Sequence, residues 1–235
     1  MIELGERLTK VANFVPKDSK VCDVGSDHAY LPVYLIQNKK ITSAIAGEVV
    51  EGPFLSAKQT VRDYLMEDHI EVRFGDGLQI LSKEDEVTAV TICGMGGELI
   101  SRILEAGYSG SHLNGRERLI LQPNVAERFV REWLMNHSYQ IVEETVVSDN
   151  HRLYEIIVAE PSNEQVEYTE LELKYGPILL KEPSELSVAK WKRTNRKNKE
   201  ILEQLQKSKT PQHEKIEQFE KAFNELQGVI DRANS

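Results

Sequence analysis

The segment Asp23-Val24-Gly25-Ser26-Asp27-His28 has the residue types of a loop that holds a small polar ligand. It lies between a short apolar run, typical of a buried strand, and a helical pattern. The glycine lets the backbone approach a ligand closely, and the N-terminus of the following helix favours an anionic group such as a carboxylate. The segment lacks the G-x-G-x-x-G glycines that seat a pyrophosphate, which disfavours a dinucleotide.

Three more segments of this kind follow along the chain. Glu48 ends a second strand-like run, where a carboxylate can accept hydrogen bonds from both hydroxyls of a ribose. Asp76, in Gly75-Asp76-Gly77, follows a third run and can accept from an adenine amino group, and Gly94-Met95-Gly96-Gly97 follows a fourth. Each segment alone could be a simple turn. Together they predict a nucleoside-shaped pocket at the carboxyl ends of consecutive strands, where open α/β sheets bind ligands.

The elements that must position these segments alternate between strand-like and helix-like runs. The expected strands span residues 20–25, 41–47, 70–74, 87–93 and 118–121. The expected helices between them span residues 29–38, 52–64, 98–106 and 125–136. This alternation predicts an α/β fold, with a parallel sheet covered by helices on both faces.

The end of this region breaks the alternation. Two strand-like runs, Tyr139–Val147 and Arg152–Ala159, are separated only by Ser148-Asp149-Asn150-His151. Such a short connection requires an antiparallel hairpin, because a parallel pair needs a crossover of about a dozen residues. A parallel sheet that ends in an antiparallel hairpin is the Rossmann-like layout of methyltransferases that use S-adenosylmethionine. A dinucleotide dehydrogenase would normally supply another parallel unit there.

We therefore interpret the pocket as a site for the cofactor S-adenosyl-L-methionine. Arg7, on a predicted amphipathic helix at the N-terminus, could reach the methionine carboxylate or could lie on the surface. Met95 and His28 could equally serve packing and helix capping. The cofactor-binding candidates are Arg7, Asp23, Gly25, Ser26, His28, Glu48, Asp76, Gly77, Gly94 and Met95. No spacing of metal ligands is present, so we expect no metal site.

Composition and charge exclude several classes of protein. A net charge of −9 disfavours a protein that coats nucleic acid over its whole surface. No apolar run approaches the ~20 residues that cross a membrane, and the first residues lack the pattern of a signal peptide. Cys22 and Cys93, the two cysteines, lie far apart in apolar runs. We expect them to be free thiols in a reducing cytoplasm, with no disulfide.

After Pro161 the composition becomes polar and helical, so we expect a first domain at residues 1–161 and a helical domain at 162–235. Ser184 can cap a helix that runs to about Lys207, and Thr210-Pro211 can begin a second helix. The second helix carries an apolar seam of coiled-coil type, so the two helices should pack antiparallel. The seam residues are Ile216, Phe219, Phe223, Leu226 and Ile230.

The first of these tail helices has a concentrated positive charge. Six cations and no acid fall between Leu186 and Lys199. A focused basic stripe on an acidic protein suggests contact with a polyanion such as RNA, although a solvated helix face has the same composition. The candidate RNA-binding residues are Lys190, Lys192, Arg193, Arg196, Lys197 and Lys199.

Four sequence segments together resemble the bacterial TrmK family. They are Asp23-Val24-Gly25-Ser26-Asp27-His28-Ala29-Tyr30-Leu31-Pro32, Gly94-Met95-Gly96-Gly97, Leu121-Gln122-Pro123-Asn124 and Leu153-Tyr154-Glu155-Ile156. The resemblance covers essentially the whole chain and is most specific from Asp23 to Pro32. It implies methylation of N1 of adenosine 22 in tRNA, with S-adenosylmethionine as donor, and a C-terminal coiled coil.

If adenine N1 is the acceptor, its lone pair can attack the sulfonium methyl directly, and no proton must be removed first. Catalysis then needs in-line positioning and a group that meets the positive charge developing on the base. Asp27, at the rim of the cofactor loop, is the first catalytic candidate. Gln122 and Asn124 could hydrogen-bond the edge of an extruded base or could merely form a turn. Tyr30 could stack on that base or belong to the core.

Two other functions remain open from the sequence. A small-molecule methyltransferase would turn over without RNA. A non-catalytic RNA- or protein-binding module on a methyltransferase fold would lack affinity for the cofactor. The tail helices could pair within one chain or between chains, and a monomer is the simpler expectation.

Overall fold

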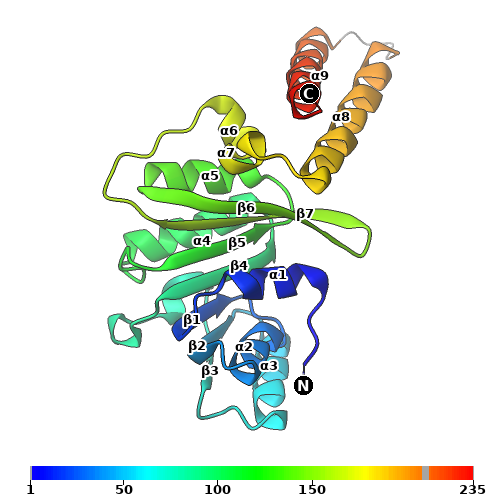
Figure 1. Ribbon diagram of the computed structural model, residues 1–235. Coiled ribbons are helices and arrows are strands. Elements are labelled where there is room, and N and C mark those ends of the chain that lie inside the picture. Colours follow the sequence, from blue (N-terminus) through cyan, green and yellow to red (C-terminus); the bar gives the residue numbers. More distant parts are fainter. Residues whose placement is uncertain (1, 208–211, 235) are drawn as a thin grey trace. The chain divides into compact units, whose positions relative to one another are not determined.

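The computed structural model describes residues 2–207 and 212–234. The chain divides into two compact units, one ending at Pro177 and the other beginning at Ile178. The first unit contains the sheet and the second contains the tail helices (Figure 1). Each unit is described by itself below.

A seven-stranded sheet forms the centre of the first unit, in the order β3-β2-β1-β4-β5-β7-β6. Strands β1 to β5 pair in parallel, and β7 pairs antiparallel with both β5 and β6. The strands are β1 (Ser19–Val24), β2 (Ile41–Glu48), β3 (Ile70–Phe74), β4 (Ala89–Met95), β5 (Arg118–Pro123), β6 (Tyr139–Asp149) and β7 (Arg152–Pro161). This topology confirms the predicted Rossmann-like methyltransferase fold with its terminal hairpin.

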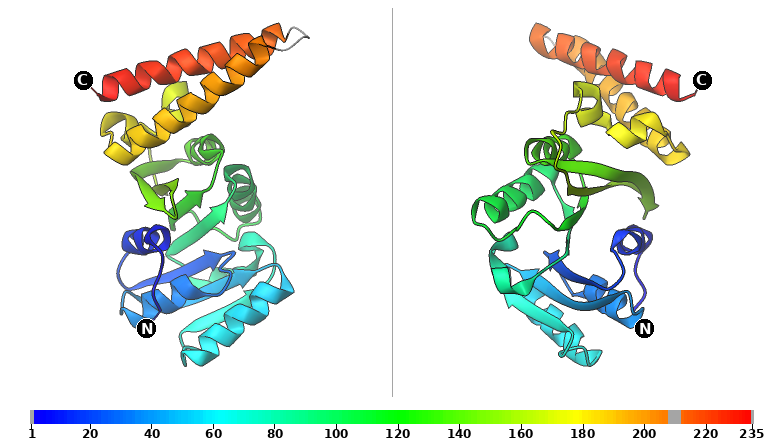
Figure 2. Two further views of the ribbon diagram at one scale, coloured as in Figure 1. Left: turned by 90° about the vertical axis from the view of Figure 1, so that its right-hand side faces the viewer. Right: turned by 60° about the vertical axis from the view of Figure 1, so that its left-hand side comes forward.

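Helices cover both faces of the sheet (Figure 2). One face packs against α1 (Glu6–Phe14), α2 (Tyr30–Gln37) and α3 (Glu51–Asp63), whose buried residues share one apolar cluster with alternate residues of the strands. The other face is covered by α4 (Gly97–Ser109) and α5 (Glu127–Asn136). Alternating side chains of each parallel strand thus enter one core or the other.

The predicted elements agree with the observed ones except at their ends. The third strand, residues 70–74, has the predicted bounds, whereas the fourth begins at Ala89 and not at Val87. Strand ends depend on where pairing with a neighbour begins, and Ala89 is the first β4 residue that pairs with both β1 and β5. The short helices α6 (Glu170–Tyr175) and α7 (Pro177–Lys181) have no counterpart among the predicted elements.

A buried ion cluster attaches α6 to the sheet. Arg131 of α5 is fully buried and pairs with Glu144 of β6 at 2.7 Å and with Glu155 of β7. Its guanidinium also donates to the backbone carbonyls of Leu173 and Lys174, at 3.3 and 3.4 Å. Burial alone would lower the pKa of Arg131, but the two carboxylates raise it above the usual value. The segment after residue 161 therefore packs with the first unit, and the boundary expected at residue 161 falls instead at Pro177.

The second unit is a pair of helices, α8 (Glu185–Gln206) and α9 (His213–Ala233), which lie side by side in both views of Figure 2. Ser184 caps α8 as predicted, because its hydroxyl accepts from the backbone N–H of Ser187 at 3.1 Å. Asn195 of α8 donates to Gln227 of α9 at 3.1 Å. Residues 208–211, which include the predicted Thr210-Pro211 start, lie outside the described residues. No helix among the described residues is long and apolar enough to cross a membrane.

Candidate active site

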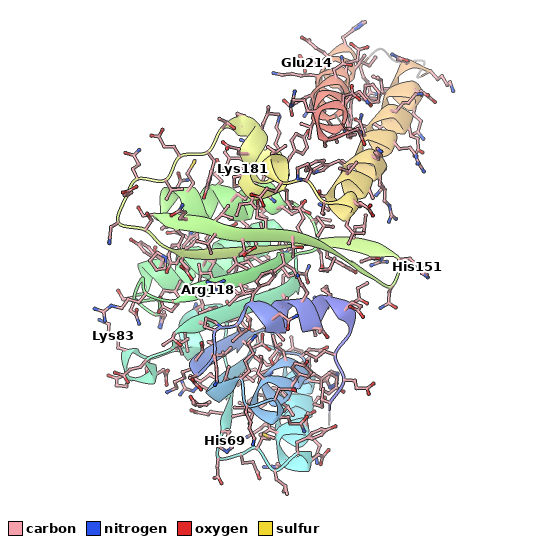
Figure 3. All side chains as sticks on the ribbon, in the orientation of Figure 1. His69, Lys83, Arg118, His151, Lys181 and Glu214 are labelled. Atoms are coloured by element: carbon pink, nitrogen blue, oxygen red, sulfur yellow. The ribbon has the colours of Figure 1, made fainter. Side chains whose placement is uncertain are left out.

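The candidate site residues lie at the edge of the sheet where the parallel strands end. In Figure 3, His151, in the turn between β6 and β7, marks the side of the sheet where the parallel strands end. Lys83, which precedes β4, marks the side where the parallel strands begin. Asp23, Glu48 and Met95 each lie at or next to the last residue of a strand. The fold therefore brings the predicted segments together, as expected from the position of each after its strand.

Asp23 is a buried carboxylate that organises the first loop. One of its oxygens accepts from the Thr91 hydroxyl of β4 and the other from the Ser26 hydroxyl, both at 2.6 Å. Burial raises the pKa of Asp23 above its usual value, and the two hydroxyl hydrogen bonds oppose that rise. Asp23 thus links the loop after β1 to β4. Ser26 contributes to the loop by donating its hydrogen bond to Asp23.

The loop turns tightly at Gly25. The Gly25 N–H donates to the carbonyl of Gly47 at 2.9 Å, and Gly25 has a φ of +67°, which a glycine adopts without strain. A Cβ atom built there would stand 2.2 Å from the methyl carbon of Met95. The Met95 side chain therefore packs directly over the glycine, and the two predicted loops meet.

Glu48 is buried at the end of β2, and its carboxylate accepts a short hydrogen bond from the backbone N–H of Asp27. Burial raises the pKa of Glu48, while this hydrogen bond lowers it. Asp27 itself has a φ of +58° and an exposed side chain, so its carboxylate lies at the rim of the loop after β1. A carboxylate at the end of the second strand is well placed to accept from ribose hydroxyls.

A pocket opens between these loops. It is lined by Val24, Gly25, Gly47, Val49, Gly75, Asp76, Gly77, Met95, Leu99 and Ile103. The glycines leave room for a ligand close to the backbone, and the polar members are few, which is the usual character of a cofactor pocket. Val49, Leu99 and Ile103 were not among the sequence candidates. Val49 comes directly after Glu48, the last residue of β2, and this place after a strand that ends in a candidate ligand is the sequence signal that could have identified it.

The side chain of His28 lies at the rim of the loop after β1 and does not cap the N-terminus of α2. Its ring stacks on Tyr30 with centroids 5.1 Å apart, and its Nε2 lies 3.6 Å from the Asp27 carboxylate. No side chain caps the start of α2. Tyr30 is exposed and does not belong to the core. An aromatic surface therefore stands beside Asp27.

Gln122 and Asn124 occupy the loop after β5. Gln122 is 0% exposed, and its side-chain oxygen accepts from the N–H of Gly94 at 3.0 Å and from the Arg7 guanidinium. Asn124 donates to the Gly94 carbonyl at 2.6 Å. The expectation that Gln122 hydrogen-bonds a base edge does not match its burial, because its amide is surrounded by protein. Arg7 lies beside Gly94, where a Cβ would be 3.7 Å from its Nη1.

A model of the family described as TrmK: tRNA (adenine(22)-N(1))-methyltransferase matches residues 21–228. The chain belongs to the TrmK family. A curated Bacillus subtilis relative named tRNA (adenine(22)-N(1))-methyltransferase is 41% identical over 98% of each chain. The crystal structure of the B. subtilis m1A22 tRNA methyltransferase TrmK superposes with a TM-score of 0.89 at 39% identity, over 98% of this chain and 100% of that chain.

Solved TrmK-like structures also contain the cofactor or its product. A Streptococcus pneumoniae structure in complex with S-adenosyl-L-methionine has a TM-score of 0.88 and 40% identity, covering 98% of this chain and 100% of that one. The Mycoplasma capricolum TrmK structure, in complex with S-adenosyl-homocysteine, has a TM-score of 0.84 and 26% identity, covering 97% of this chain and 98% of that one. Both therefore share the fold described above over nearly the full chain.

The basic residues of the tail lie on α8, and most are exposed. Trp191 and Asn195 are buried on the side of α8 that meets α9. At about 100° per residue, Lys190, Arg193, Arg196 and Lys197 lie on the opposite half of the helix, whereas Lys192 and Lys199 lie toward its sides. Among the described residues, no group of three His, Cys, Asp or Glu side chains is arranged to hold a metal ion. Cys22 and Cys93 are both free.

Proposed function

We propose that this chain is an S-adenosylmethionine-dependent tRNA methyltransferase that modifies N1 of adenosine 22. The observation that carries the proposal is the match of the TrmK family over residues 21–228, which includes the loops that build the pocket. Nearly complete coverage of the B. subtilis relative supports the same activity.

The pocket residues fit S-adenosylmethionine. Asp76, which lines the pocket, would accept from the adenine amino group, while Val49, Leu99 and Ile103 would offer apolar contact to the adenine ring. Glu48, next to Val49 at the end of β2, would accept from the ribose hydroxyls. The loop after β1 begins a helix whose N-terminus favours the methionine carboxylate. The cofactor, when bound, supplies an electrophilic methyl group on its sulfonium.

The base must present N1 to that methyl group. Because N1 of adenine carries a lone pair, the protein has no proton to remove from it and must instead orient the ring and offset its developing positive charge. The exposed Asp27 carboxylate is our candidate for the group that offsets this positive charge. The stacked rings of His28 and Tyr30 provide a surface on which an extruded base can stack.

We propose that the cationic face of α8 binds the tRNA backbone. Replacing Lys192, Arg196 and Lys197 by Ala should weaken tRNA binding and make the slope of log affinity against log salt shallower by roughly one per lost phosphate contact. The matched control replaces three cations of α9, Lys215, Lys221 and Arg232, by Ala. Equal losses from both triple variants would mean that net charge alone, and not the α8 face, governs binding.

The decisive test of function is incubation with labelled S-adenosylmethionine and unmodified tRNA, followed by nucleoside mass spectrometry. We expect 1-methyladenosine from wild-type tRNA and none from tRNA in which adenosine 22 is replaced by guanosine. Turnover of small molecules without RNA would favour a small-molecule methyltransferase. Absence of cofactor binding by calorimetry would favour a non-catalytic module.

Two further proposals concern setting and assembly. The protein would act in the cytoplasm, where tRNA is present and where the free thiols Cys22 and Cys93 stay reduced. It would act as a monomer, since α8 and α9 of one chain pack against each other. Light scattering after gel filtration measures the mass, and a dimer mass would contradict this expectation.

A further inference from the structure

The side-chain amide of Gln122 uses its whole hydrogen-bonding capacity within the protein. Its oxygen accepts from the Arg7 guanidinium and from the Gly94 N–H at 3.0 Å. Its nitrogen donates to the Pro123 carbonyl at 2.9 Å and to the Asn124 side-chain oxygen at 3.1 Å. An amide side chain offers two acceptor and two donor positions, and all four are taken. Gln122 is also fully buried, so it has nothing left to offer a substrate.

Asn124 completes the contacts on the same glycine. Its side-chain nitrogen donates to the Gly94 carbonyl at 2.6 Å, and its backbone N–H donates to the Met95 carbonyl at 2.7 Å. Both the N–H and the C=O of Gly94 are therefore held by side chains from the end of β5. The two amide side chains are in turn bonded to each other, so they cannot reorient independently.

Gly94 is the residue at which β4 departs from regular pairing. It has a φ of +78°, and the register between β4 and β5 shifts between Cys93 and Met95. This bulge directs the chain so that Met95 packs over Gly25, in the loop that follows β1. The position of Met95 against the cofactor pocket thus depends on how Gly94 is held.

Arg7 connects this arrangement to two other elements. It comes from α1, and its guanidinium carbon lies 5.5 Å from the centroid of the Tyr154 ring on β7. A guanidinium over an aromatic face is held by a cation–π attraction as well as by its hydrogen bond. Helix α1 and strands β5 and β7, far apart in the sequence, therefore support the same bulge.

We propose that Arg7, Gln122 and Asn124 are positioning residues for methyl transfer, which clamp Gly94 so that the Gly94-Met95 bulge holds the methyl-donor side of the pocket in place. The inference rests on the proposed methyltransferase function. It reassigns Arg7 from the methionine carboxylate, and the buried Gln122 from the base edge, to the support of this bulge, which the exposed Asn124 also contacts through its side chain. The clamp contributes to the rate of transfer without touching the base.

The first test observes the bulge directly and needs no activity. The chain has four methionines, so protein labelled with ¹³C-methyl methionine gives few signals, and Met95→Leu identifies that of Met95. We expect Arg7→Ala and Gln122→Ala each to shift the Met95 signal, and the double variant to shift it no further. Arg62→Ala and Gln140→Ala, at exposed positions outside the clamp, serve as matched controls. A Met95 signal that is unchanged in both clamp variants would overturn the proposal.

The second test is a double-mutant cycle on the single-turnover rate, at saturating S-adenosylmethionine and tRNA. A displacement of about 1 Å at a reacting centre can cost roughly 100-fold in rate, so we expect losses of about 10- to 100-fold for Arg7→Ala and for Gln122→Ala. Because both act through one bulge, the double variant should be no slower than the slower single variant. Affinity for tRNA and for S-adenosyl-homocysteine, measured by calorimetry, should change less than about threefold.

Gln122→Glu keeps both acceptor interactions and loses the donations, so we expect a rate between wild type and Gln122→Ala. Rate losses that multiply in the double variant would show independent roles and overturn the clamp. If Gln122→Ala instead weakened tRNA binding while the single-turnover rate stayed at the wild-type value, Gln122 would contact the base and the clamp would be overturned. If the wild-type protein methylates no tRNA while the Met95 signals move as expected, the proposed function has failed and the structural clamp stands.

Discussion

The buried ion cluster around Arg131 gives a stability prediction whose size follows from the structure. Replacing Arg131 by Met removes the guanidinium from between Glu144 and Glu155, whose side chains are 0% and 3% exposed. It also removes the donor to the carbonyls of Leu173 and Lys174. Methionine is apolar and of similar length, so little packing volume is lost, and the effect should come from the charges.

Removing one partner of a buried ion pair typically costs about 3–5 kcal/mol, because the remaining charge stays in a medium that solvates it poorly. Domains of this kind unfold with roughly 5–15 kcal/mol. We therefore expect Arg131→Met to lose a large fraction of the stability of the first unit.

Urea denaturation followed by circular dichroism measures the difference. The matched control is Arg128→Met on the same helix, whose side chain is 40% exposed and pairs with Glu170 at 3.1 Å. An exposed ion pair contributes about 0–1 kcal/mol, so the control should lose no more than that. A loss below about 1 kcal/mol for Arg131→Met, or equal losses for the two variants, would refute the reasoning.

Three further predictions concern the cofactor pocket. Gly25→Ala should cost about 1–2 kcal/mol of stability from its left-handed φ and should weaken S-adenosylmethionine binding, as measured by calorimetry; unchanged binding would separate Gly25 from the pocket. Because burial raises the pKa of Glu48, cofactor affinity should fall on acidification at a pH above that at which an ordinary glutamate titrates, and Glu48→Gln should flatten that profile. Asp27→Asn should slow methyl transfer while cofactor affinity stays unchanged, and a wild-type single-turnover rate would remove Asp27 from the mechanism.

The fold could be predicted from the sequence because its signals are local. Apolar runs that end in Asp23, Glu48 and Gly94 mark the strands, and the short connection at residues 148–151 determines that the last two strands form a hairpin. The position of the pocket then follows from topology alone. The resemblance to the TrmK family then predicted the substrate and the activity.

The details of the site could not be predicted, since they depend on contacts between distant segments. The amide of Gln122 has the donor and acceptor groups of a base-binding side chain. Only the structure shows that its oxygen already accepts a hydrogen bond from Arg7, 115 positions earlier. Arg131 looks like an ordinary cation on an amphipathic helix until β6 and β7 bring Glu144 and Glu155 to it. The short helix α6 is missed because six residues carry too little periodicity.

The hydrogen bond between Asn195 and Gln227 favours one alignment of the tail helices. Sliding α9 by one turn would bring Phe223 or Ile230 near Asn195 and leave its amide nitrogen buried among hydrocarbon. Apolar seams alone tolerate such slips, since one large side chain can replace another. A single amide pair therefore favours one alignment of α9 along α8.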